Sequence, residues 1–372
     1  MRVMIIAGEA SGDLHGAGVV RELKRLDPDC EIFGVGGDKM QSAGMQLIYH
    51  VRELSIMGFW EVLQHLPLIR SVEKTMEALL RARTPDVLLL IDYPGFNLRF
   101  ARIARNYKTA IVYYISPQVW AWNPGRVKKM KGVIDKMLTV FPFEVDIYKK
   151  EGIDVEFVGH PLLEELGEQQ SRDEFCKRWT LDHNKKIVGL FPGSRKQELE
   201  RIFPAMIGAA RLLYRHYGSE TVVGIASTLE PGYVRSFLRD DFPLTLIQNA
   251  THDAMKNSDV AIVTSGTATL ETAYLRTPMI VVYKTSMVTY IIGRLLVKIK
   301  NIGLVNIVAG RTIVPEILQS SVTPQKLAEA ASAILDSDDA RTTMSSNLAE
   351  VKNNLGTAGA SLRVAKTVLS MA

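Results

Sequence analysis

The chain has 372 residues, a formal net charge of +5 at pH 7, 47% hydrophobic residues and 23% charged residues. This composition excludes a disordered or fibrous protein and leaves room for two globular domains. The small excess of positive charge does not by itself indicate nucleic-acid binding. The two cysteines cannot form a disulfide framework, and no run of about 18 uncharged apolar residues indicates a membrane span.

The first half of the chain alternates apolar runs with segments of helical period. The apolar start, VMIIA, is short and is followed at once by Glu9 and Asp13, so it predicts a buried strand rather than a signal peptide. Buried strands that alternate with helices predict a parallel sheet. Strands are expected at residues 2–7, 31–35, 87–91, 109–115, 136–140 and 156–158, and helices between them, for example at 14–26 and 72–83.

A second series of elements follows the polar stretch at residues 164–184. It predicts a second α/β domain, so the fold class is α/β with two Rossmann-like, doubly wound domains that face a cleft. Ligands of such sheets bind beyond the carboxyl ends of the strands, where functional motifs should gather. The strands of this half are expected at residues 186–190, 221–225, 244–247, 260–263 and 279–282.

The first strand is followed by GEASGDLHG, residues 8–16. Gly8 and Gly12 allow a tight turn, and Ser11 or Asp13 can cap the next helix. His15 falls in the first helical turn and either lines the cleft or faces solvent. The motif is not G-x-G-x-x-G, which argues against a dinucleotide site, and a plain strand-to-helix turn is the alternative.

The segment LLLIDYPGFNLR, residues 88–99, places Asp92 directly after an apolar strand. Pro94 and Gly95 then turn the chain, so Asn97 is expected to face the same space. A carboxylate at a cleft edge can take a proton from a hydroxyl nucleophile. The alternative for Asp92 is an Asx-turn or a helix cap.

Polar and aromatic residues also follow the strand at 109–115, in YYISPQVWAWNPGRVKKMKG, residues 113–132. Tryptophans at this spacing suit a sugar face or an acyl chain, although core packing is the commoner use. The basic run after them is either solvated surface or a border of the cleft. The residues are Ser116, Gln118, Trp120, Trp122 and Asn123, and the basic run is Arg126, Lys128, Lys129 and Lys131.

Two strand-to-helix junctions in the second half suit an anion. In GLFPGSR, Gly193, Ser194 and Arg195 precede a helix, where backbone N–H groups and the helix dipole favour negative charge. In IVTSGTATLETAYLRTP, residues 262–278, the run Ser265, Gly266, Thr267, Ala268 and Thr269 repeats this arrangement, and Glu271 can reach a ribose diol. Capped helices without a ligand are the alternative. No P-loop motif accompanies either junction.

Ten motifs together resemble one family, that of lipid-A-disaccharide synthase, an inverting glycosyltransferase family with the two-domain GT-B architecture. The resemblance covers about residues 3–320. It is carried, in chain order, by AGEASGD, GVGGDKM, MGFWEVL, IDYPGFN, YYISPQVWAW, FPFE, FVGHPL, FPGSRKQE, SGTATLE and VPEILQ.

The resemblance implies the transfer of a sugar from UDP-2,3-diacylglucosamine to 2,3-diacylglucosamine 1-phosphate (lipid X), which gives a β-1,6-linked disaccharide phosphate and UDP. It implies no metal or other cofactor and no nucleic acid, it allows a homodimer, and it places the enzyme in the cytoplasm, peripherally on the inner membrane. It assigns residues 1–165 to the acceptor and 184–340 to the UDP-sugar, with a helix at 341–372 that crosses back to the first domain.

The resemblance also implies roles for the motif residues. Several family members carry a second acid in D-x-P-D-F-N, which is a candidate base in them. This chain has Gly95 at that position, so Asp92 is the expected base. Asp13 and His15 are the reserve candidates for the base. Arg195 would stabilise the leaving group. The expected donor contacts are Gly193, Ser194, Arg195, Ser265, Gly266, Thr267, Ala268, Thr269, Glu271, Asn306, Glu316 and Gln319, and the acceptor contacts are Glu9, Ser11, Gly12, Asp13, His15, Asn97, Ser116, Gln118 and Trp120.

Acylated substrates favour a membrane-contacting segment beside the acceptor site. The segment SIMGFWEVLQHLPLIR, residues 55–70, offers an apolar stripe with few charges, and MVTYIIGRLLVKIK, residues 287–300, is a second candidate. The alternative is that both stripes belong to a core. The expected membrane contacts are Ile56, Met57, Phe59, Trp60, Leu63 and Leu66.

Two rival functions share the expected architecture. One is another enzyme of the same fold acting on UDP-N-acetylglucosamine, either a 2-epimerase or the glycosyltransferase of peptidoglycan synthesis. The other is a nucleotide-sugar binding protein without turnover. The ten motifs match neither enzyme, and a binding protein needs no base, so both rivals are less favoured.

Overall fold

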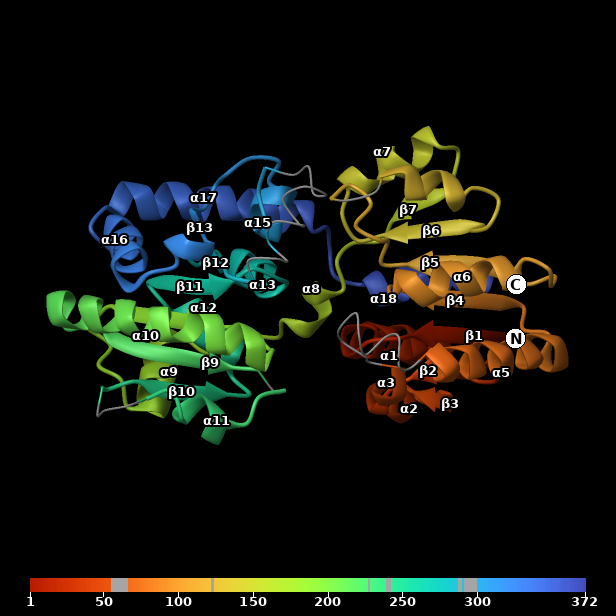
Figure 1. Cartoon of the computed structure of the whole chain (residues 1–372), viewed down its shortest axis with the longest axis horizontal. Helices are drawn as coiled ribbons and strands as arrows, with labels where there is room; N and C mark the ends of the chain where they lie inside the picture. The colour runs from red at the N-terminus through yellow and green to blue at the C-terminus, as the bar shows by residue number, and fades with distance from the viewer. Residues whose placement is uncertain (55–65, 122–123, 227, 239–241, 287–289, 291–299) are drawn as a thin grey trace. The chain divides into compact units, whose positions relative to one another are not determined.

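The computed structural model describes residues 1–54, 66–121, 124–226, 228–238, 242–286, 290 and 300–372 (Figure 1). Their contacts divide the chain into two compact units. The first comprises residues 1–164 together with 355–372, and the second comprises residues 165–354.

The first unit is built on a parallel sheet. Within the described residues it has seven strands in the order β3-β2-β1-β4-β5-β6-β7. The order reverses between β1 and β4, which makes this pair the switch point of the sheet. The strands are β1 (Arg2–Ala7), β2 (Glu31–Gly36), β3 (Gln46–His50), β4 (Val87–Ile91), β5 (Ala110–Tyr114), β6 (Lys136–Thr139) and β7 (Val155–Phe157).

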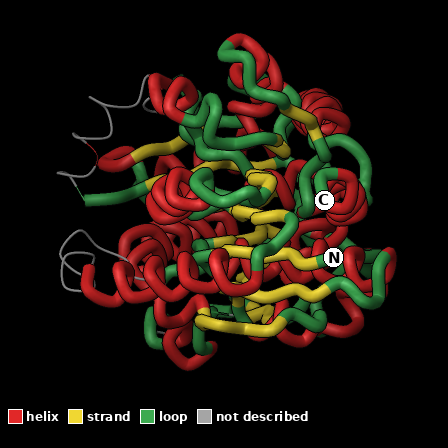
Figure 2. Tube along the Cα trace, turned by 90° about the vertical axis from the view of Figure 1, so that its right-hand side faces the viewer, coloured by secondary structure: helices red, strands yellow, loops and turns green. Residues whose placement is uncertain are grey.

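Helices cover this sheet, and in Figure 2 the strands lie between layers of helix. The last helix of the chain packs on the first one. Ser361 fixes it there, because its N–H and hydroxyl donate to the Glu164 carboxylate at 2.8 and 2.5 Å. The helices are α1 (Ala10–Leu26), α2 (Asp38–Ser42), α3 (Val51–Leu54), α5 (Leu66–Arg83), α6 (Pro94–Ala104), the 3₁₀ helix η1 (Pro124–Lys129), α7 (Phe143–Lys150), α8 (Leu162–Glu165) and α18 (Ala360–Ser370).

The second unit repeats the architecture. Its described residues form a six-stranded parallel sheet in the order β10-β9-β8-β11-β12-β13, so its switch point lies between β8 and β11. The strands are β8 (Ile187–Phe191), β9 (Glu220–Ile225), β10 (Thr245–Gln248), β11 (Val260–Thr264), β12 (Met279–Tyr283) and β13 (Glu316–Leu318).

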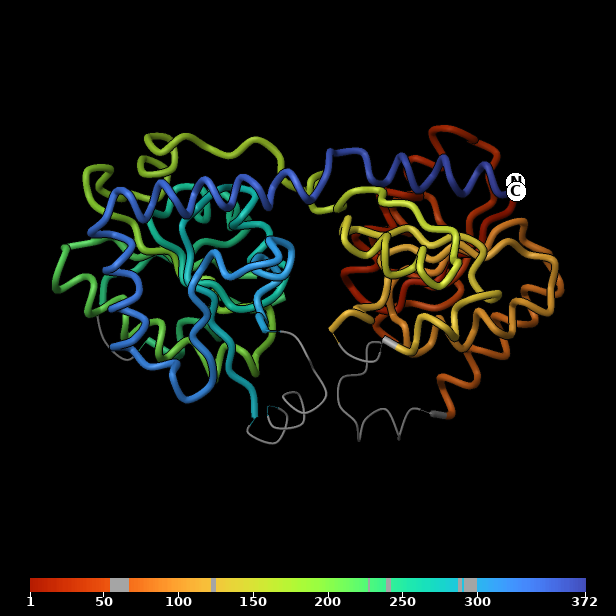
Figure 3. Tube along the Cα trace, turned by 90° about the horizontal axis from the view of Figure 1, so that it is seen from above, coloured from red at the N-terminus to blue at the C-terminus, as the bar shows by residue number. Residues whose placement is uncertain are grey.

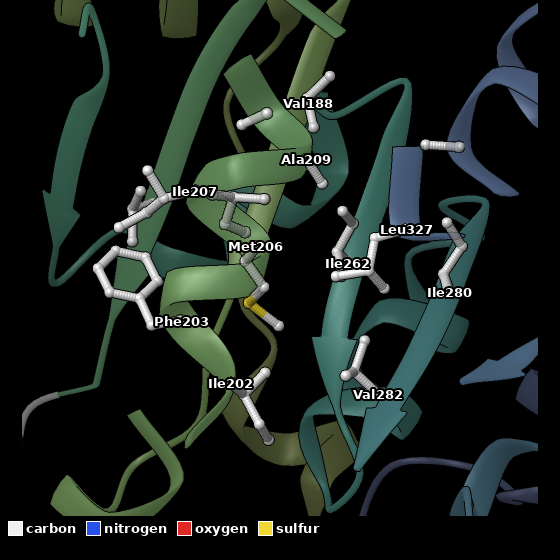
Figure 4. Close-up of a cluster of buried hydrophobic side chains, with 14 of the residues drawn as sticks. Val188, Ile202, Phe203, Met206, Ile207, Ala209, Ile262, Ile280, Val282 and Leu327 are labelled. Atoms are coloured by element: carbon white, nitrogen blue, oxygen red, sulfur yellow. The ribbon is translucent and has the colours of Figure 1, made fainter. Parts of the chain in front are cut away.

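The core of the second unit is organised around one long amphipathic helix, α10 (Lys196–Tyr217). Figure 4 shows Phe203, Met206 and Ile207 of this helix in one buried cluster with the strand residues Ile262 and Ile280. The other helices are α9 (Arg172–Trp179), α11 (Pro231–Arg235), α12 (Thr251–Asn257), α13 (Ala268–Tyr274), α15 (Leu304–Val308), the 3₁₀ helix η2 (Gln319–Ser321), α16 (Pro324–Leu335) and α17 (Asp338–Asn354).

The single C-terminal helix expected at residues 341–372 is two helices. Helix α17 belongs to the second unit and α18 to the first (Figure 3). The break has a backbone cause, because Gly356 and Gly359 have φ of 84° and 95°, which an α-helix does not allow.

The two parallel sheets confirm the predicted doubly wound α/β fold class. Each strand predicted from the sequence is present, with ends that differ by at most one residue. Strands β3 and β13 were not predicted. Their residues are mostly half-buried, so neither gives the continuous apolar run that identified the central strands.

Gly34 is the position in the first sheet where only glycine fits. Its φ is 146°, and a Cβ there would overlap the Ile5 carbonyl oxygen of the neighbouring strand β1. A register shift between β2 and β3 occurs at the same place. We therefore expect Gly34→Ala to lower the free energy of unfolding by about 2–4 kcal/mol, measured by urea denaturation.

Gly95→Ala is the matched control in the same unit, because a Cβ at Gly95 meets nothing within 4 Å. This substitution should leave stability unchanged or raise it by about 0.4–1 kcal/mol. Equal effects of the two substitutions would contradict the role assigned to Gly34.

Candidate active site

The carboxyl edge of the first sheet brings two predicted loops together at its switch point. Ala7 at the end of β1 pairs with Ile91 at the end of β4, so the turns that begin at Gly8 and Asp92 lie side by side. They are in close contact, because a Cβ on Gly8 would overlap the ring of Tyr93. The order of the strands therefore places Asp92 where ligands of doubly wound sheets bind.

Asp92 stands in an unusual backbone conformation. Asp92 and Tyr93 both have φ of 47°, in the left-handed region that costs non-glycine residues about 1 kcal/mol or more. Two bonds hold the carbonyl oxygen of Asp92, one from the Tyr113 hydroxyl at 2.6 Å and one from Asn97 Nδ2 at 2.7 Å. The surrounding structure thus fixes Asp92 in a conformation that its own backbone does not favour.

The environment of the Asp92 side chain favours the protonated form. Burial raises the pKa of its carboxyl to about 6, and the negative charge of Glu9 adds to this; a hydrogen bond from the Tyr93 N–H and the proximity of His15 act in the opposite direction. A carboxylate with this pKa can take a proton near neutral pH much better than an ordinary aspartate. Asp92 is therefore suited to be a general base.

Asn97 does not face open space as predicted. The sequence suggested a turn at Pro94, but Pro94 begins helix α6, and Asn97 is fully buried in its first turn. Its Nδ2 group donates to the carbonyl oxygens of Ile6 at 3.4 Å, Ile91 at 3.2 Å and Asp92 at 2.7 Å. Asn97 therefore holds the ends of two neighbouring strands together.

Asp13 has a structural partner far along the chain. It does not cap α1, whose N-cap is Glu9. Instead its buried carboxylate accepts hydrogen bonds from the N–H groups of Gly37, Met40 and Lys39 at 2.7, 3.0 and 3.2 Å, at the start of α2. Its oxygens are occupied by these donors, so Asp13 is a poor candidate for the base.

The other residues of the first motif lie near Asp92 in varied surroundings. Glu9 and Ser11 are exposed, His15 is half-buried, and Gly12 is buried with Ala7 Cβ only 3.2 Å from where a Cβ would lie. Burial and the neighbouring His15 lower the pKa of His160 to about 3, so His160 is neutral. His160 belongs to the motif FVGHPL, but its sequence context gave it no role.

The loop after β5 is fixed by a residue that the site prediction missed. Glu144 is 1% exposed, and its Oε1 accepts hydrogen bonds from Ser116 Oγ at 2.6 Å and Trp120 Nε1 at 3.1 Å. The Ser116 hydroxyl is thus used within the protein rather than presented to a ligand. Gln118, between them, is exposed. Glu144 belongs to the motif FPFE, but an acid at a helix start is typical of an ordinary dipole partner.

The second unit places its two predicted anion loops side by side. Phe191 at the end of β8 pairs with Val263 near the end of β11, so the turn at Gly193 and the turn at Ser265 leave the same sheet edge at the switch point. Gly193 has φ of 101°, and a Cβ there would overlap the Glu198 carboxylate. Arg195 is exposed and pairs loosely with Glu198, with NH1 and Oε1 3.6 Å apart.

The start of helix α10 is the better of the two anion sites. This helix has 22 residues, and the exposed Ser194 and Arg195 stand at its N-terminus, where the helix dipole is strongest. Helix α13 has only seven residues and contributes less. Gly266, Thr267 and Ala268 remain accessible in its turn.

Two hydroxyl groups in the second loop have partners within the protein. Ser265 Oγ donates to the Ile302 carbonyl oxygen at 3.1 Å, and the buried Thr269 Oγ1 donates to the Gly266 carbonyl oxygen at 2.7 Å. The Thr269 hydroxyl therefore donates within its own turn, and its contact with a phosphate stays a prediction.

Glu271 is oriented by a histidine that sequence reasoning did not single out. His252 Nε2 lies 3.3 Å from Glu271 Oε2, and the hydrogen bond to Glu271 raises the pKa of His252. His252 is in the first turn of α12 and Glu271 in that of α13. The pair fixes a carboxylate one helical turn from the Thr267 turn.

Two of the three residues at 306–319 that were predicted to contact the donor have hydrogen-bond partners within the chain. Asn306 is fully buried; its Oδ1 accepts from Ile313 N, and its Nδ2 donates to Glu316 Oε1 at 2.8 Å. Glu316 also accepts from the N–H groups of Ile302 and Gly303, at 2.9 and 3.0 Å. The polar side-chain atoms of Asn306 and Glu316 therefore take part in hydrogen bonds within the chain.

Gln319, the third of these residues, is only partly used within the chain. It has a left-handed φ of 54° and is 9% exposed. Its Oε1 accepts from Thr285 N at 3.3 Å, and its buried Nε2 has no hydrogen-bond partner among the described residues. A buried amide donor without a partner is uncommon in folded proteins.

Most of the predicted membrane contacts lie outside the described residues. These are Ile56, Met57, Phe59, Trp60 and Leu63; Leu66 begins helix α5. Among the helices that the structure describes, none has both the length and the apolar character needed to cross a membrane. In the same part of the chain, no three His, Cys, Asp or Glu side chains are grouped as metal ligands.

Solved structures share this architecture at low sequence identity. The UDP-GlcNAc 2-epimerase from Neisseria meningitidis bound to UDP-GlcNAc aligns over 100% of both chains with a TM-score of 0.67 and 14% identity. The calicheamicin glycosyltransferase CalG4 aligns over 100% of this chain and 98% of its own with a TM-score of 0.65 and 14% identity. These likenesses show the fold that glycosyltransferases and epimerases of this type share.

Sequence comparison identifies the family. The family model described as lipid-A-disaccharide synthetase matches residues 3–364. The lipid-A-disaccharide synthase of Geobacter sulfurreducens is 42% identical over 100% of this chain and 97% of its own, and that of Myxococcus xanthus is 37% identical over the same shares. That of Coxiella burnetii is 36% identical over 98% of this chain and 97% of its own. The chain therefore belongs to the lipid-A-disaccharide synthase family of glycosyltransferases.

Proposed function

We propose that this enzyme forms the lipid A disaccharide 1-phosphate by transferring the sugar of UDP-2,3-diacylglucosamine to the 6-hydroxyl of 2,3-diacylglucosamine 1-phosphate. Family membership supports the reaction. The observation that carries the mechanism is the half-buried Asp92, whose pKa is raised to about 6 at the switch point of the first sheet.

The chemical step is a direct displacement. Asp92 takes the proton of the 6-hydroxyl while that oxygen attacks C1 of the donor sugar on the face opposite to UDP. The bond between C1 and the diphosphate oxygen breaks, and UDP leaves with its electron pair. One displacement inverts the configuration at C1, so the new linkage is β.

The second unit is proposed to hold UDP. The exposed Arg195 and the N–H groups at the start of α10 offer positive potential to the diphosphate, whose negative charge grows as the bond to C1 breaks. The Glu271 carboxylate, fixed by His252, is placed to accept hydrogen bonds from the ribose hydroxyls. Arg195 exchanges its loose contact with Glu198 for the diphosphate when UDP binds.

Asp92 is preferred to its neighbours as the base for a structural reason. Gly95, which replaces an acid found in some family members, provides no side chain. Asp13 is held by three backbone donors. The surroundings of Asp92, chiefly its burial and then the charge of Glu9, disfavour its carboxylate by about 3 kcal/mol, the equivalent of a pKa change from 3.8 to about 6. A residue that costs stability in this way is expected to serve the chemistry.

Asp92→Asn should separate catalysis from stability. Asparagine tolerates the left-handed conformation and does not ionise, so stability at pH 7 should be unchanged or higher while kcat falls by at least about 100-fold. In the wild type, kcat/KM for the acceptor should fall as the pH drops below about 6, because the base becomes protonated. The measurements are UDP release with both lipids present, and thermal unfolding. A variant with wild-type turnover would move the role of base to another group.

Arg195→Ala should remove most of the leaving-group stabilisation. We expect kcat to fall by about 100- to 1,000-fold, as for other preorganised donors to a developing oxyanion. Lys196→Ala is the matched control, because Lys196 is the next residue and its ammonium lies over the Tyr233 ring, 5.2 Å from the centroid. Its rate should stay within about threefold of wild type. Similar losses in the two variants would show that general charge, not Arg195, supports the reaction.

Membrane contact is proposed for the basic surface of η1 and the residues after it. Lys128, Lys129 and Lys131 are exposed there, in the unit that carries the acceptor loops. Each basic residue near an anionic surface contributes about 1 kcal/mol, so replacing all three lysines by glutamate should weaken vesicle binding at least about 100-fold. Flotation with vesicles that contain about 30% phosphatidylglycerol at low salt, compared with neutral vesicles, measures this effect.

The control is a second triple variant with the same change in net charge. Lys177, Lys185 and Lys256 are exposed residues of the second unit, and their replacement by glutamate should leave vesicle binding within about threefold of wild type. If the two triple variants lose binding equally, net charge alone explains the attraction and no docking surface is present.

A further inference from the structure

A single buried carboxyl group accepts hydrogen bonds from both ends of the loop that follows β5. Glu144 Oε1 accepts from Ser116 Oγ at 2.6 Å and from Trp120 Nε1 at 3.1 Å, two donors that lie four residues apart. Its other oxygen, Oε2, accepts from the Phe141 N–H at 3.3 Å. Helix α7 thereby holds both ends of the segment that runs from Ser116 to Trp120.

The rest of this loop depends on the same contacts. It leaves β5 through Ile115, whose φ is 63°. Its own backbone supplies only short turn bonds, Val119 N to Pro117 O at 2.6 Å and Ala121 N to Gln118 O at 3.1 Å. Neither bond ties the loop to the rest of the unit, and the Tyr148 hydroxyl of α7 adds only a long hydrogen bond to the Pro117 carbonyl oxygen, at 3.5 Å. The Glu144 carboxyl therefore provides the main polar anchor of the loop.

Aromatic packing from the same helix sets the orientation of the indole. The ring of Trp120 lies edge-on to Phe143, with centroids 5.5 Å apart, and Phe143 is stacked on Phe141 at 5.5 Å. Trp120 is half-buried and Gln118 is exposed, so the loop presents one polar and one aromatic side chain. Such a pair suits a sugar, whose ring stacks on aromatic faces while its hydroxyls need hydrogen-bond partners.

Burying the Glu144 carboxyl group costs desolvation free energy, which an apolar residue at the same position would avoid. Burial raises its pKa to about 7, while the bonds from Ser116, Trp120 and Phe141 lower it. An apolar residue at this position would avoid the desolvation of a carboxyl group, but it would leave the Ser116 hydroxyl and the Trp120 N–H without an acceptor. The carboxyl is suited to hold two side-chain donors of the loop at once.

We propose that Glu144 is a positioning residue for the acceptor, whose buried carboxyl holds Ser116 and Trp120 so that the loop presents Gln118 and the indole to the acceptor sugar. This inference rests on the proposed function, which assigns the first unit to the acceptor. It adds a residue that touches neither substrate and acts only through the loop.

Glu144→Leu and Glu144→Gln test the role kinetically. Leucine removes the acceptor for both loop donors, so KM for the acceptor should rise about 10- to 100-fold while KM for the UDP-sugar stays within about twofold. Glutamine keeps an oxygen that can accept from Ser116 and Trp120, so it should restore KM for the acceptor to within about fivefold of wild type. Hydrogen exchange of the Val119 and Ala121 amides should accelerate in Glu144→Leu and much less in Glu144→Gln.

A double-mutant cycle distinguishes positioning from general loosening. Trp120→Phe keeps an aromatic ring but loses the N–H that reaches Glu144. If the two residues act through their hydrogen bond, the double variant with Glu144→Leu should be little worse than the poorer single variant. Losses that simply multiply would overturn the proposed linkage.

Ile147→Ala is the matched control for destabilisation. Ile147 lies on the same helix and packs against the core of the first unit, but its aliphatic side chain can make no polar contact with the loop. Its KM for the acceptor should stay within about twofold of wild type. An unchanged KM in Glu144→Leu, or an equal rise in Ile147→Ala, would overturn the inference.

The wild type separates this inference from the proposed function. If the wild type releases no UDP with both lipids present, the proposed function fails, whereas the hydrogen-exchange result still reports on the loop.

Discussion

Parallel pairing at two switch points is the constraint on which both candidate sites depend. In the first sheet the register of β1 and β4 sets the Gly8 turn beside Asp92, and in the second the register of β8 and β11 sets the Gly193 turn beside Ser265. Helices that leave to opposite faces cannot close over the sheet edge between such strands. The chain therefore builds two open edges from residues that are far apart in sequence, and each edge acquires its own chemistry from the loop residues directly after its strands.

Buried carboxyl groups are used in this protein for different purposes. Asp13 accepts three backbone N–H groups and fixes the start of α2, whereas Glu144 accepts two side-chain donors and fixes a loop. Among the contacts described for Asp92, its carboxylate receives one backbone hydrogen bond, from Tyr93, and burial governs its pKa. The number of donors around each carboxyl thus separates the groups that hold the structure from the group proposed for proton transfer.

Much of the architecture was predictable from the sequence, because central parallel strands are buried on both faces and leave continuous apolar runs. Val87–Ile91 and Val260–Thr264 are examples. The positions of Asp92 and Gly193 at strand ends followed directly from those runs. The roles of polar residues within the site were harder to predict, because a sequence pattern does not reveal a hydrogen-bond partner that is distant along the chain. Asp13 meets the turn at Gly37, and Asn97 meets Ile6. Both were candidates for ligand contact until their partners were known.

The first unit is not contiguous in sequence, because it needs helix α18 from residues 360–370 as well as residues 1–164. Ser361 of that helix is tied to Glu164, and Gly18 of α1 leaves room for it, since a Cβ there would overlap the Ser361 hydroxyl. A growing polypeptide emerges from the ribosome N-terminus first, so the first unit must wait until residues 360–370 have been made before α18 can pack on α1. The second unit, residues 165–354, is continuous in sequence and can therefore complete its fold earlier. The N-terminal unit of this chain therefore cannot be complete before residues 165–354 have been synthesised, in contrast to the usual domain-by-domain order.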